Sequence, residues 1–120
     1  MACELLNVRR LVDSQCIDTL PLHDATLKHV VVRWSERCVE GHFRAFRVPD
    51  QPAESLVLTW NGVRDIQIPQ RAPWGDSHFV NSARQRRVAE ELESFEIEMQ
   101  SGNVISVSAA RLSVEWMGAP

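Results

Sequence analysis

The residues best suited to chemistry in this sequence are its four histidines: His23, His29, His42 and His78. In the hairpin predicted for residues 26–48, His29 and His42 fall in diagonal positions on one face, close enough to be two metal ligands. A catalytic zinc ion needs three protein ligands, and the neighbouring Val31 and Arg44 supply none. We therefore expect no metal and no cofactor, and a surface or half-buried histidine pair.

His23 and Asp24 are adjacent, and an acid beside an imidazole can relay protons. Sequence neighbours on a strand point to opposite faces, so Asp24 is better explained as a turn or cap residue before the first long strand. The chain also lacks the motifs G-x-S-x-G, G-x-x-x-x-G-K-[ST], G-x-G-x-x-G and H-E-x-x-H. We expect no enzyme; the alternative is a small enzyme that uses His23 or His78 with a carboxylate.

The cysteines, Cys3, Cys16 and Cys38, are odd in number and show no C-x-x-C spacing, which favours a reducing compartment. Residues 1–10 hold only one apolar pair before two arginines, which is too little for a signal peptide. No run is long enough for a transmembrane helix. These features predict a cytoplasmic protein that does not bind membranes.

Size and charge suggest one globular domain over residues 1–120. Hydrophobic residues make up 44% and charged residues 24% of the chain, the usual mixture of folded proteins. The formal net charge is −3. Proteins that bind nucleic acid normally carry a basic excess, because phosphate neutralisation supplies much of their affinity. Nucleic acid is therefore not an expected partner.

Residues 26–48 are rich in β-branched and aromatic side chains and predict a hairpin with its turn at residues 35–37. A favourable charge pair, with Arg33 opposite Glu40, sets the expected register. The buried face of this hairpin is predicted to consist of Val30, Val32, Trp34, Val39 and Phe43. Trp60 and Trp116, which also lie on predicted strands, are expected in the core.

Weaker patterns cover the middle of the chain. Residues 56–60 form an apolar run that ends at the dipeptide 61–62, Asn-Gly, which favours a type I′ turn. Residues 63–68 are therefore expected to return as the partner strand. A further strand is expected to begin at residues 79–80, and residues 84–93 are expected to form a helix or a solvated loop.

Alternation of apolar and polar residues is clearest near the C-terminus. Residues 95–100 and 104–109 predict a hairpin with one buried face, and residues 112–116 predict a last strand. Residues 4–13 fit a short helix or a strand. The fold expected is mainly β, α+β at most: an antiparallel curved sheet, a sandwich or a half-open barrel of about six or seven strands.

Charge placement suggests a binding surface. Five carboxylates fall within nine residues, and a loop tryptophan and aspartate precede them. Such a loop tryptophan either caps the core or anchors a protein interface. Arginines at positions 84, 86 and 87 could pair with these carboxylates in an ordinary solvated face. The predicted partner-binding residues are Trp74, Asp76, Glu90, Glu91, Glu93, Glu96 and Glu98.

Four short segments carry a resemblance: residues 22–25 (LHDA), 61–63 (NGV), 73–75 (PWG) and 96–102 (EIEMQSG). They resemble small single-domain bacterial β-proteins of the immunity type, from polymorphic or contact-dependent toxin systems. The resemblance implies that the protein binds a cognate toxin, such as a basic nuclease domain, and blocks its activity. A different possibility is a structural subunit that forms a homodimer through an uncovered edge strand at residues 112–116.

Overall fold

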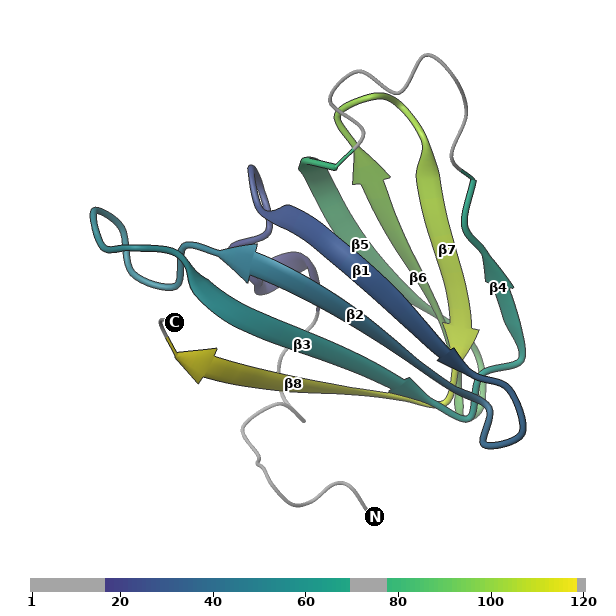
Figure 1. The fold of residues 1–120 in the computed structure, drawn as a ribbon. Coiled ribbons are helices and arrows are strands. Elements are labelled where there is room, and N and C mark those ends of the chain that lie inside the picture. Colours follow the sequence, from purple (N-terminus) through teal and green to yellow (C-terminus); the bar gives the residue numbers. More distant parts are fainter. Residues whose placement is uncertain (1–16, 70–77, 119–120) are drawn as a thin grey trace.

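The computed structural model describes residues 17–69 and 78–118. Within them, eight strands form two antiparallel sheets, with strand orders β1-β2-β3-β8 and β4-β7-β6-β5 (Figure 1). The strands are β1 (Thr26–Arg33), β2 (Cys38–Ala45), β3 (Glu54–Asn61), β4 (Asp65–Gln67), β5 (Val80–Ala89), β6 (Leu92–Met99), β7 (Val104–Ala109) and β8 (Arg111–Gly118). A 3-10 turn, η2 (Ile17–Thr19), packs against β5.

The predicted mainly β fold is confirmed, with two sheets and no closed barrel. The described residues contain eight strands, more than the six or seven expected. None of their helices is long and apolar enough to cross a membrane. The segment predicted as a short helix or strand, residues 4–13, lies outside the described residues.

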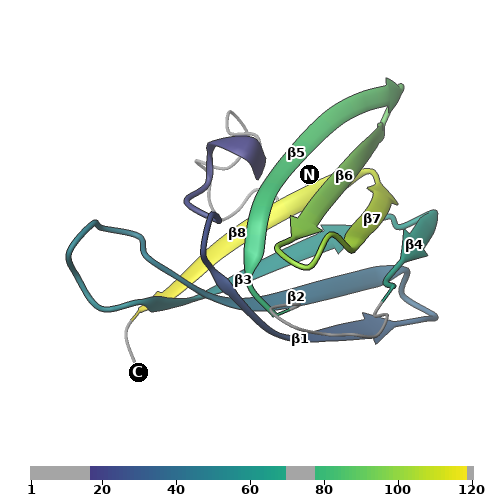
Figure 2. The same ribbon diagram turned by 90° about the horizontal axis from the view of Figure 1, so that it is seen from above.

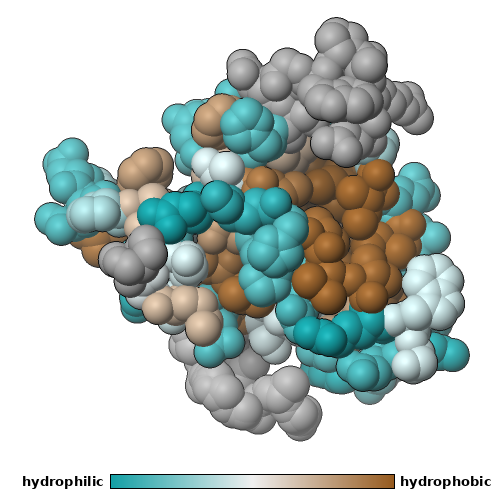
Figure 3. Space-filling view, in the orientation of Figure 1, coloured by the Kyte–Doolittle hydropathy of each residue, from teal (hydrophilic) through white to brown (hydrophobic). Residues whose placement is uncertain are grey.

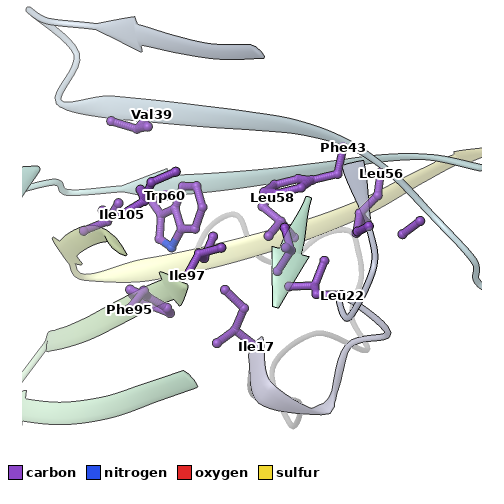
Figure 4. Close-up of a cluster of buried hydrophobic side chains, with 14 of the residues drawn as sticks. Ile17, Leu22, Val39, Phe43, Leu56, Leu58, Trp60, Phe95, Ile97 and Ile105 are labelled. Atoms are coloured by element: carbon purple, nitrogen blue, oxygen red, sulfur yellow. The ribbon is translucent and has the colours of Figure 1, made fainter. Parts of the chain in front are cut away.

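The core lies between the two sheets, which Figure 2 shows as two diverging layers. Strict alternation on β3 and β6 places one apolar face of each strand inside. The Trp60 and Phe95 rings meet edge to face, with centroids 6.0 Å apart (Figure 4). Trp60 is buried as predicted, and Trp116 is half-buried against the same core.

β1 and β2 form the predicted hairpin, but the predicted register is wrong by two residues. Arg33 pairs with Cys38, so the loop takes residues 34–37. This longer loop carries Trp34 out of the sheet, and its side chain is 83% exposed instead of buried. Val32 is also exposed, at 42%. The remaining predicted members of this face are buried or half-buried: Val30, Val39 and Phe43.

The hairpin predicted around Asn61 and Gly62 is also wrong. β4 does not pair with β3; it pairs with β7 in the other sheet. Gly62 has a φ of 68°, and the Ala110 amide donates to the Asn61 and Gly62 carbonyl oxygens at 3.0 and 3.2 Å. The β3–β4 and β7–β8 connections therefore meet at one corner, where the chain passes between the sheets.

Residues 84–93 form neither a helix nor a solvated loop. β5 begins at Val80, as expected from the start predicted at residues 79–80, and runs to Ala89. A tight turn with Glu91 at a φ of 57° then leads into β6. Charged pairs across β5 and β6 stabilise a hairpin that has few apolar residues on one strand.

The two C-terminal predictions are confirmed. β6 and β7 form the hairpin expected from the alternation of residues 95–109. β8 follows and pairs with β3, which places it at the edge of its sheet.

Candidate protein-binding surfaces

The five predicted glutamates all lie on the β5–β6 hairpin. Glu90 and Glu91 form its turn and are exposed. Glu96 and Glu98 lie on the opposite face of β6 from its buried apolar residues, as the alternation predicted. The Glu93 side chain is mostly buried, with 19% of its surface exposed. Two further predicted contact residues lie outside the described part of the chain: Trp74 and Asp76.

Arginines of β5 offset part of this negative charge. Arg84 Nε donates to Glu96 Oε1 at 2.7 Å, and Arg87 Nη2 donates to Glu93 Oε2 at 3.1 Å. Both arginines are largely exposed, so each pair contributes at most about 1 kcal/mol to stability. Glu98 accepts hydrogen bonds from two neutral side chains of β5. This hairpin is therefore mixed in charge, with the excess negative charge at its turn and at Glu98.

A second polar cluster lies on the outer face of the β1–β2–β3–β8 sheet. His29 and His42 are direct cross-strand partners, and their rings stack with centroids 4.2 Å apart. His42 Nε2 donates to Glu40 Oε1 at 3.1 Å, and Arg33 Nε donates to Glu40 Oε2 at 3.2 Å. These hydrogen bonds, that from His42 above all, lower the pKa of Glu40.

The histidine pair shares a face, as predicted, although the two residues are directly opposite rather than diagonal. Stacked rings do not direct their nitrogen atoms to a common point. Among residues 17–69 and 78–118, no group of three or more His, Cys, Asp or Glu side chains could hold a metal ion.

The adjacent His23 and Asp24 belong to the turn before β1, as predicted for Asp24. Asp24 has a φ of 68° and accepts a hydrogen bond from Gln100 Nε2 at 2.7 Å. His23 Nδ1 donates to the Asn81 carbonyl oxygen at 2.8 Å, and both turn side chains are more than 60% exposed.

Burial raises the pKa of the Cys38 thiol, which disfavours its nucleophilic thiolate form.

An apolar groove opens between β1 and β4, the edge strands of the two sheets. Leu27 and Val30 line it from β1, Ile66 and Ile68 from β4 and the residues after it, and the core ring of Trp60 closes its floor. Figure 3 shows apolar side chains gathered on this side of the molecule. The two sheets do not close over their core here, so apolar surface stays open to solvent.

Trp34 follows β1 directly, at the start of the loop that leads into β2. Its 83% exposure makes it the most exposed large hydrophobic side chain in the described part of the chain. Val32, two residues earlier in the chain, is also exposed. The sequence pattern placed Trp34 inside the strand, so its exposure was not predicted. A hairpin loop of four residues, 34–37, would have placed Trp34 outside the sheet.

No protein-family model matches this chain, and no curated protein has a significantly similar sequence. Its fold is similar to that in the crystal structure of an uncharacterized protein from Neisseria gonorrhoeae. The TM-score is 0.56 at 11% sequence identity, and the match covers 78% of this chain and 91% of that chain. This similarity concerns the fold alone.

Proposed function

We propose that this protein is a protein-binding module that neutralises a cognate bacterial toxin domain in the cytoplasm. Trp34 carries the proposal, because its exposed indole contributes little to the core. Tryptophan is enriched among the few residues that dominate binding energy at protein interfaces. An immunity protein needs such a binding surface and needs no catalysis.

The neighbouring groove supports a protein partner. Contiguous exposed apolar surface on a small soluble protein commonly marks an interaction site. Here Leu27 and Val30 of β1 line the groove, and the edges of β1 and β4 offer backbone groups beside it. A partner that covers this surface with apolar side chains would therefore bury it and reach free backbone hydrogen-bonding groups.

The carboxylates of the β5–β6 hairpin give the proposal its electrostatic component. Glu90, Glu91 and Glu98 are exposed, and Glu93 and Glu96 are paired with arginines. A local negative field speeds encounter with a basic partner, such as a nuclease domain, more than it adds affinity.

The proposal expects a toxic domain encoded beside this protein, and the test co-produces that domain with the full chain in growing cells. We expect the chain to restore growth and to form a stoichiometric complex in size-exclusion chromatography. Trp34→Ala is expected to raise the dissociation constant about 30-fold, as loss of an interface hot spot does. Phe46→Ala is the matched control, since Phe46 is an exposed aromatic residue at the opposite end of β2.

Absence of both growth rescue and a complex would overturn the proposed function. Rescue and tight binding that Trp34→Ala leaves unchanged would preserve the function and remove Trp34 from the contact surface.

A further inference from the structure

β8 presents a long unpaired edge. It pairs with β3 from Arg111 to Gly118, and no other strand of the described residues pairs with its second edge. Long edge strands are usually protected by a bulge in the exposed edge, by proline or by inward-pointing charges, because they can pair with another chain. β8 contains no proline, and its register against β3 shifts only near its end, between Trp116 and Gly118. Its two charged residues, Arg111 and Glu115, are exposed on the outer face.

These two charges have no ion-pair partner among the described residues. They lie four residues apart on the same face of one strand, about 13 Å at the usual rise per residue, which is too far for them to pair with each other. They are also symmetric about Ser113. An antiparallel second copy of β8 with its two-fold axis at Ser113 sets Arg111 of each chain opposite Glu115 of the other.

The same register is favourable on the inner face. Leu112 of each chain lies opposite Val114 of the other, and both side chains are half-buried where β8 borders the core. A second strand covers this open border with apolar residues and pairs the exposed backbone groups. We propose that the protein forms a symmetric homodimer through β8, which joins two sheets into one of eight strands.

The β1 edge is less suited to a second copy. Antiparallel pairing of two β1 strands about Val31 sets His29 opposite Arg33, so the charges that pair across β8 have no equivalent there. Lys28, also exposed, adds positive charge to the same strand. Charge complementarity therefore favours β8 over β1, and this inference does not depend on a toxin partner.

Charge reversal tests the dimer. Sedimentation equilibrium of the full chain over a concentration series is expected to show a monomer–dimer equilibrium. Arg111→Glu or Glu115→Arg alone replaces two ion pairs with like-charged pairs, and each is expected to raise the dissociation constant about tenfold. The double variant restores opposite charges and is expected to return the constant close to that of the wild type.

Arg86→Glu is the control, because it makes the same charge change at an exposed site on β5. Circular dichroism and thermal unfolding establish that each variant is folded. A wild-type chain that stays monomeric would overturn the proposal. So would a dimer that neither single reversal weakens, or one that the double reversal fails to restore.

Discussion

The corner between the two sheets depends on a glycine, and we expect Gly62→Ala to be strongly destabilising. Gly62 has a φ of 68°, a left-handed conformation that disfavours any residue with a Cβ atom. A Cβ atom added there would lie 2.9 Å from the Cβ atom of Ala110. The substitution therefore combines backbone strain with a steric clash.

The two contributions can be estimated separately. Left-handed backbone costs an alanine about 1–2 kcal/mol, and overpacking a well-packed site costs about 1–3 kcal/mol. Gly62→Ala should thus lower the free energy of unfolding by about 2–5 kcal/mol. Ala110→Gly removes the clashing atom, and the next nearest atom, the Ala110 backbone nitrogen, lies 3.6 Å away, at ordinary contact distance.

A double-mutant cycle separates strain from clash. Urea unfolding of the wild type, both single variants and the double variant, followed by tryptophan fluorescence, gives the four free energies. Gly62→Ala is expected to cost only about 1–2 kcal/mol in the Ala110→Gly background, so the coupling energy equals the clash, about 1–3 kcal/mol. A coupling energy near zero would refute the proposed close packing of the two connections.

Two further predictions concern charged residues. The pKa of Glu40 is lowered in the folded state, so its ionised form stabilises the protein above the ordinary carboxyl pKa, and this stabilisation is lost as the pH falls through the lowered value. Glu40→Gln should therefore reduce stability at neutral pH and flatten its fall toward acid pH in urea unfolding; an unchanged pH profile would contradict this. Replacing Glu96 and Glu98 together by Lys should slow association with a basic partner in low-salt stopped-flow experiments and leave folding largely intact, whereas unchanged association rates would exclude these residues from the contact surface.

In the C-terminal half, the alternation of apolar and polar residues is sufficient to predict the strands. Residues 95–100 alternate so regularly that only a half-buried strand satisfies them, and β6 forms there. The start of β5 was predicted, but its continuation through residues 84–89 was not, because residues 84–87 are mostly charged. Its strand conformation depends on cross-strand partners such as Glu96, which are distant in sequence.

Register was harder to predict because it depends on one loop. The predicted pairing of Arg33 with Glu40 does form an ion pair, with 3.2 Å between Nε and Oε2, but from a diagonal position. Several registers satisfy the same charge attraction, and the left-handed Arg37, with a φ of 53°, selects the longer loop. Arginine rarely adopts a left-handed conformation, so the sequence gives no signal for this loop, and the exposure of Trp34 could not be deduced from it.

The two proposed surfaces occupy opposite edges of one sheet, because the strand order β1-β2-β3-β8 places β1 and β8 farthest apart. Dimerisation through β8 therefore leaves the β1 edge, with Trp34 and the apolar groove, open in both chains. Since Trp34 lies at the β1–β2 loop and Arg111 begins β8 beside Asn61, neither surface shares a strand with the other. If both proposals hold, a dimer of this geometry binds two partner molecules, and we expect a complex with two copies of each chain. Trp34→Ala is then expected to weaken partner binding about 30-fold while the dimer persists.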